Sequence, residues 1–67
     1  MSIISNKTAI ETLNNRIKNL IIDKKIKERE LILEQDYEEK EIIQGIIFTI
    51  EDKIEECKRE INYIMQD

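Results

Sequence analysis

The second half of the chain carries the most regular apolar pattern. From residue 43 onward, apolar side chains alternate spacings of four and three residues without interruption. This alternation is typical of a coiled-coil seam. The seam consists of Ile43, Ile47, Ile50, Ile54, Cys57, Ile61 and Ile64. We therefore expect a helix over about residues 36–66 whose seam packs against another helix.

The first half predicts a helix over about residues 6–33, with an apolar stripe that changes face. The stripe begins with Ile10, Leu13, Ile17 and Leu20 at helical spacing. Lys24 and Lys27 occupy the next positions on this face, and the apolar residues that follow lie on a roughly opposite face of the helix. We predict that this second face is an interaction surface, made of Ile22, Ile26, Leu33, Tyr37 and Phe48.

Capping patterns place the helix ends. Thr8 with Glu11 three residues later fits a capping box and predicts a start between Ser5 and Thr8. Asp36 with Glu39 fits the same pattern and predicts a second start. The two patterns favour a chain that folds back at about residues 34–36.

The fold class is therefore all-α, and an antiparallel, coiled-coil-like helical hairpin is the favoured architecture of one domain over residues 1–67. One continuous coiled-coil helix is the alternative. It is supported by the absence of Gly or Asn at the proposed turn. It is also supported by an eleven-residue repeat, which favours a nearly straight coil. The repeat comprises Ile10, Ile21, Ile32, Ile43, Ile54 and Met65.

Charge is divided between the two halves. Residues 1–29 carry seven Lys or Arg and three Asp or Glu, whereas residues 30–67 carry four and twelve, which together give the net charge of −4. An antiparallel arrangement sets the basic arm beside the acidic one. We expect Lys18 to face Asp52 and Arg29 to face Glu41, either within a hairpin or between antiparallel chains.

The two opposed apolar faces predict self-association. A hairpin uses one face for its internal contact, so the second face predicts contact with another molecule. Two hairpins packed through it would make a homodimeric four-helix bundle. The alternative occupant of the surface is another protein.

Two single residues bear on packing. Gly45 lies inside the second helical pattern, where Gly costs about 1 kcal/mol relative to Ala. We expect close approach of a neighbouring helix or side chain to account for it, with a kink or helix end as the second interpretation. Cys57, the one cysteine, occupies a seam position and is expected to be a buried, unreactive thiol.

The composition offers little for catalysis. The chain has no His, no phosphate-binding Gly-rich loop and no nucleophile–base pair, so we expect no enzyme and no cofactor. The acidic run from Glu34 to Glu41 lacks the Gly and ligand spacing of a calcium loop, so we predict no metal site. That run leaves open an acidic mimic of nucleic-acid phosphates that blocks a basic site on another protein.

Other partner classes fit poorly. A sequence pI near 4.9 argues against nucleic-acid binding. The longest apolar stretch, residues 42–50, is far short of the roughly 20 residues that a membrane span needs. A single cysteine and the absence of a long apolar N-terminal run indicate a cytoplasmic protein.

The function we expect is therefore a small helical protein–protein interaction module. It self-associates and binds a partner protein, as small regulators or inhibitors encoded by mobile elements or phages do. The competing interpretation is a purely structural coiled-coil unit with no regulated partner.

Overall fold

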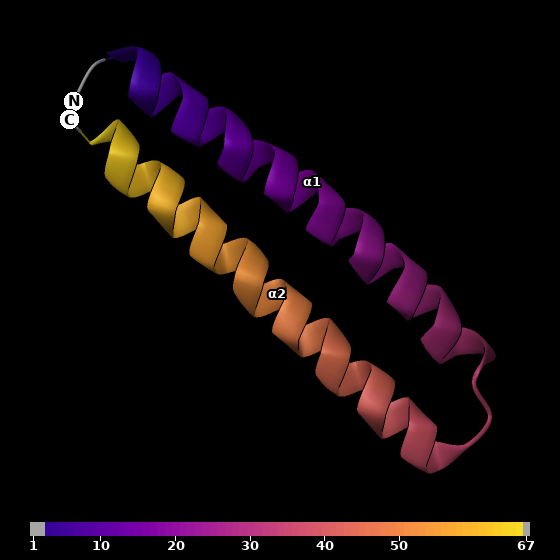
Figure 1. The fold of residues 1–67 in the computed structure, drawn as a ribbon. Helices are drawn as coiled ribbons and strands as arrows, with labels where there is room; N and C mark the ends of the chain where they lie inside the picture. Colours follow the sequence, from indigo (N-terminus) through magenta and orange to yellow (C-terminus); the bar gives the residue numbers. More distant parts are fainter. Residues whose placement is uncertain (1–2, 67) are drawn as a thin grey trace.

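The chain folds into two antiparallel helices joined by a short turn. A computed structural model describes the backbone of residues 3–66 and the side chains of residues 6–66. Helix α1 runs over Ile3–Leu33 and helix α2 over Tyr37–Met65. The beginning of α1 and the end of α2 lie at the same end of the molecule, opposite the turn (Figure 1). This arrangement confirms the hairpin, and the alternative of one continuous helix is wrong for this chain.

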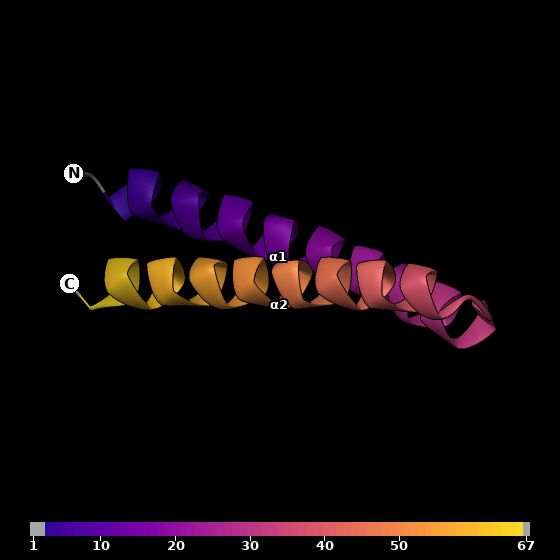
Figure 2. The same cartoon turned by 90° about the horizontal axis from the view of Figure 1, so that it is seen from below.

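The hairpin is a narrow rod. Its Cα atoms extend over 51 × 15 × 11 Å. The two helices cross at a shallow angle rather than lying side by side in one plane, as the view from below shows (Figure 2). Such shallow crossing is the geometry of coiled-coil-like helix pairs, in which apolar ridges of one helix fit the grooves of the other.

The core is a single row of side chains between the helices. Five residues of the α2 seam are buried, each at most 9% exposed, and Leu13 of α1 joins them at 7%. The five are Ile43, Ile47, Ile50, Ile54 and Cys57. Ile61 and Ile64, nearer the open end, are half-buried, as are Ile10, Ile17 and Leu20 of α1. The seam of α2 therefore supplies five of the six buried side chains among the described residues.

The turn is made by carboxylates instead of by Gly or Asn. The Glu34 amide still donates a helical hydrogen bond to the Glu30 carbonyl, at 2.9 Å. Asp36 then takes an extended backbone conformation, with φ −80° and ψ 123°. No residue in the described part of the chain has a positive φ. A reversal without a left-handed residue explains how the turn forms despite the lack of Gly.

Two side chains cap the backbone amides around the turn. The Asp36 carboxylate accepts a hydrogen bond from the Glu38 amide at 3.2 Å, so Asp36 is the N-cap of α2, as the sequence predicts. The amides of Gln35 and Asp36 both donate to Oε1 of Glu34, each at 3.1 Å. In a capping box, the Glu39 side chain would accept a hydrogen bond from the amide of the N-cap residue, Asp36. Here the Glu34 side chain, which comes before the turn, accepts that hydrogen bond instead.

The predicted start of the first helix is wrong. Thr8 was expected to cap the helix, but α1 begins at Ile3 and Thr8 lies inside it. Its carbonyl accepts a hydrogen bond from the Thr12 hydroxyl at 3.0 Å. Ser and Thr hydroxyls bond either to amides at a cap or to carbonyls one turn back, so the residue pattern alone does not fix the boundary.

Neither helix could cross a membrane. Over the residues that the structure describes, no helical segment is both long and apolar enough to span a bilayer.

The carboxylate caps predict how the turn responds to substitution. Asp36→Ala should lower the free energy of unfolding by about 1 kcal/mol, because the Glu38 amide loses its acceptor. Glu34→Ala should also destabilise the hairpin, since two amides lose their partner, whereas Glu34→Gln keeps an acceptor oxygen and should be milder. Urea unfolding followed by circular dichroism at one protein concentration measures all three. Equal stability of Glu34→Ala and Glu34→Gln would contradict the capping role.

Candidate interaction surface

In the half of α1 nearest the turn, lysines face α2. Lys24 and Lys27 are half-buried, on the face that Leu13, Ile17 and Leu20 occupy in the preceding turns. The Lys24 ammonium lies 3.0 Å from the Glu51 carboxylate of α2. This hydrogen bond, together with the charge of Glu51, raises the pKa of Lys24. Lys24 and Lys27 therefore take two inner positions of α1 between Leu20 and the half-buried Leu31, and Lys24 joins α1 to α2 through an ion pair.

Most apolar side chains of the same half of α1 point away from α2, and Leu31 is the half-buried exception. Ile22 is 56% exposed, Ile26 51% and Leu33 74%. At about 100° per residue, Ile22 lies opposite Leu13 on the helix. Over residues 22–27, apolar residues thus lie outside and lysines inside, the reverse of an ordinary amphipathic helix.

Helix α2 adds exposed apolar residues in the same region. Tyr37 is 72% exposed and Phe48 58%. Nine of the eleven large apolar side chains that are exposed among the described residues lie between residues 21 and 48. We call these nine the turn-end surface: Ile21, Ile22, Ile26, Ile32, Leu33, Tyr37, Ile42, Ile46 and Phe48.

All five residues predicted for the interaction surface belong to the turn-end surface. Their exposure is observed, and their role in binding stays a prediction. The other four were missed by sequence reasoning. Ile21 and Ile32 could have been found from the eleven-residue repeat, and Ile42 and Ile46 each directly precede a seam residue.

One shallow groove crosses the turn end between the helices. Its lining combines the apolar Leu33, Ile42, Ile43 and Ile46 with the charged Lys27, Glu30, Glu34 and Glu39. Lys27 and Glu30 form an ion pair at 3.0 Å on one side of it. Apolar residues with charged edges are typical of surfaces that bind another protein.

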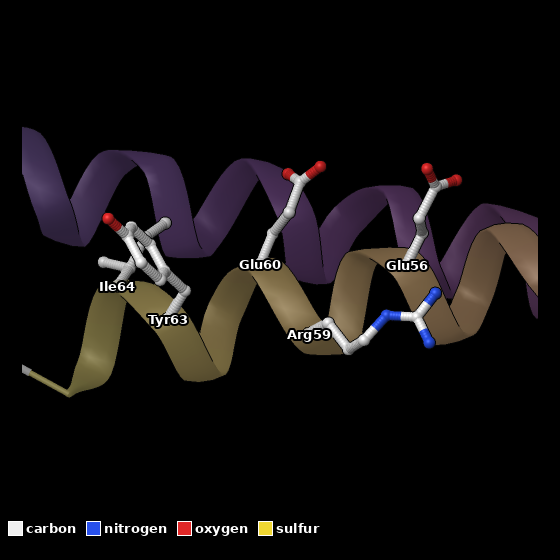
Figure 3. A pocket seen from close by; sticks show the side chains of 5 residues that line it. All are labelled: Glu56, Arg59, Glu60, Tyr63 and Ile64. Atoms are coloured by element: carbon white, nitrogen blue, oxygen red, sulfur yellow. The ribbon is translucent and has the colours of Figure 1, made fainter.

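A second hollow lies near the open end and belongs to α2 alone. Its lining is Glu56, Arg59, Glu60, Tyr63 and Ile64, side chains from successive turns of one helix (Figure 3). Tyr63 and Ile64 project at one end of it and the two glutamates stand along the helix (Figure 3). A ligand here would be covered from one side only, which is unlike the concave sites that hold small molecules.

The predicted ion pairs do not form between the arms of one hairpin, and their formation between chains stays a prediction. Neither Lys18 with Asp52 nor Arg29 with Glu41 forms an ion pair in the described structure, and all four side chains are exposed. The link between the arms is Lys24 with Glu51. The predicted partners lie on the outer faces of the two helices, too far around each helix to meet within one hairpin.

The explanation offered for Gly45 is also wrong within one chain. Gly45 is exposed, and a Cβ atom built there would meet nothing within 4 Å. Helix α2 continues through it, and the Thr49 hydroxyl donates to its carbonyl at 3.0 Å. No neighbour in the described part of the hairpin requires a glycine, so the cost in helix propensity has no intramolecular reason.

The acidic run from Glu34 to Glu41 serves the turn. Glu34 and Asp36 accept the capping hydrogen bonds, while Glu38 and Glu39 lie in the first turn of α2, where negative charge favours the helix dipole. Among the described residues, no group of three or more His, Cys, Asp or Glu side chains could hold a metal ion.

Comparison with known proteins found no relative of this chain. No family model, curated protein or solved structure matches the chain.

The two kinds of apolar position should respond differently to mutation. Replacing Ile22 and Ile26 together with Lys should change the free energy of unfolding of the monomeric hairpin by no more than about 0.5 kcal/mol per site, because both side chains are already exposed. Ile47→Ala should cost about 2–5 kcal/mol, since Ile47 is only 4% exposed. Unfolding of dilute protein, where association is negligible, gives both values. A large loss from the lysine pair in dilute protein would mean that these isoleucines belong to the hairpin core.

Cys57 gives a second measure of the core. Its free thiol is 5% exposed, so a thiol reagent should label it slowly in the native state and rapidly in urea. Glu55→Cys in a Cys57→Ala background gives an exposed control thiol on the same helix. Equal labelling rates for the two thiols would show that the seam opens readily.

Proposed function

We propose that this protein is a non-enzymatic helical interaction module that self-associates through its turn-end surface. The observation that carries the proposal is the inverted segment of α1 over residues 22–27, with lysines on the side of α2 and isoleucines toward solvent. Within a single hairpin these isoleucines stay in water and add little to stability, whereas burial of an Ile side chain would stabilise the fold by about 1.5–3 kcal/mol. It is favourable only if another molecule covers them.

A second copy is the first occupant we propose for this surface. Two hairpins joined through it contain four helices, and the four-helix bundle is the simplest assembly of that kind. The separation of charge supports antiparallel neighbours, because the basic α1 of one copy can then lie against the acidic α2 of the other.

The same surface is suited to a helix of a partner protein, bound in the groove at the turn end. We propose that binding such a helix regulates the partner protein. We also propose that the protein is cytoplasmic, which its free cysteine supports. The shallow hollow on α2, open on one side, supports a role in protein binding over catalysis.

Light scattering coupled to size exclusion tests self-association. The mass of the wild-type protein should rise above that of one 8.1 kDa chain as concentration increases through the micromolar range. The double variant Ile22→Lys, Ile26→Lys should remain a folded monomer, because charged side chains oppose burial of the surface. A wild-type protein that stays monomeric to millimolar concentration would refute the proposal.

A further inference from the structure

The outer face of α1 carries a continuous stripe of five exposed residues. They are Lys18, Ile22, Ile26, Arg29 and Leu33, at successive spacings of four, four, three and four. Such spacing keeps them on one side of the helix, opposite the face that contacts α2. In the described structure, neither Lys18 nor Arg29 has an ion-pair partner. We call this set the α1 outer stripe.

The outer face of α2 carries a stripe of the same length. It comprises Tyr37, Glu41, Gly45, Phe48 and Asp52, at spacings of four, four, three and four. All five are exposed, and the carboxylates of Glu41 and Asp52 have no ion-pair partner among the described residues. We call this set the α2 outer stripe.

The two stripes are complementary when one is laid antiparallel on the other. Lys18 then faces Asp52, and Arg29 faces Glu41. Between these pairs Ile22 faces Phe48, and beyond them Leu33 faces Tyr37. Ile26 faces Gly45, where the missing side chain leaves open space for it.

We propose that the α1 outer stripe of one copy binds antiparallel to the α2 outer stripe of a second copy, in this register. The proposal rests on the self-association proposed above, and it replaces the closed four-helix bundle with a specific open contact. It gives Gly45 a reason, because a glycine opposite Ile26 lets the two helices approach closely. It also gives the four unpaired charges their partners, so charge complementarity selects a second copy over an unrelated helix.

The contact is of the head-to-tail type. Each stripe lies opposite the hairpin's own interface, so a copy that binds through α1 still presents a free α2 stripe. Contacts of this kind close into rings or continue as filaments. The mass should therefore exceed that of a dimer at high concentration, which separates this contact from a closed bundle of two hairpins.

Charge reversal tests the register. Arg29→Glu places acid against Glu41 in every contact, and Glu41→Arg places base against Arg29. Each variant alone should assemble at least tenfold more weakly than the wild type in sedimentation velocity. An equimolar mixture should recover assembly, because the carboxylate introduced at position 29 of one chain meets the guanidinium introduced at position 41 of the other, and the second contact keeps the natural pair. Circular dichroism should show an unchanged hairpin in each variant, since neither side chain has an ion-pair partner within its described part.

Matched variants off both stripes control for net charge. Lys53→Glu and Glu60→Arg make the same charge changes on a different face of α2, and both should assemble as the wild type does. If Arg29→Glu assembles normally, or if both reversals weaken assembly and their mixture does not recover it, this contact is overturned while self-association stands. A wild-type protein that never assembles overturns both.

Substitution of Gly45 gives an independent test, because it should raise the stability of the monomer and weaken assembly. Gly45→Leu should raise the melting temperature of dilute, monomeric protein, because leucine favours the helix and meets open space. The same change should weaken assembly at least tenfold, because the new side chain occupies the place of Ile26 from the second copy. Assembly as strong as that of the wild type would overturn the proposed contact.

Discussion

A pair of helices has one interface, and that constraint governs everything else in this molecule. Each helix of a hairpin can bury only one stripe of side chains against its neighbour, and the other faces stay in water. The chain has more apolar residues than one interface can take. Helix α2 fills its stripe with the seam from Ile43 to Cys57. Helix α1 fills its stripe with apolar residues as far as Leu20, gives the next two inner positions to Lys24 and Lys27, and has an apolar residue there again at Leu31.

This allocation makes the turn end different from the open end. A lysine at an inner position can reach a carboxylate of the neighbouring helix with its ammonium, as Lys24 does with Glu51. The hairpin is therefore closed at the turn end by an ion pair, by the caps on Glu34 and Asp36, and by the seam of α2. None of these needs the isoleucines of α1 that lie outside, which remain available for another molecule.

The fold can be predicted from the sequence where a residue pattern is compatible with only one structure. The unbroken four–three alternation of α2 has no other explanation, so the helix and its buried face follow from it. The N-cap of α2 follows as well, because Asp36 precedes a clear apolar pattern. The start of α1 cannot be predicted in the same way. A threonine hydroxyl can cap a helix or donate to the carbonyl one turn back, and the same sequence is compatible with both.

Contacts across the hairpin could be predicted only in part, because they depend on rotation of each helix about its axis. The expected pairs Lys18–Asp52 and Arg29–Glu41 have a register that suits antiparallel helices, but their residues lie on the wrong faces for one hairpin. Charge order along a chain fixes which residues lie level with one another. It does not fix whether they face inward, which is decided by the apolar seam.

The eleven-residue repeat shows why the seam decides. Its members Ile43 and Ile54 are buried, but Ile32 is 81% exposed and Ile21 39%. Over one repeat an eleven-residue spacing returns to nearly the same face of a straight helix, whereas a seam in a left-handed pair must advance every seven residues. Once α2 commits to seven, the isoleucines of α1 that obey eleven drift out of the interface. The exposure of Ile21 and Ile32 thus results from two periodicities in one chain, and only a contact outside the hairpin can bury these two side chains.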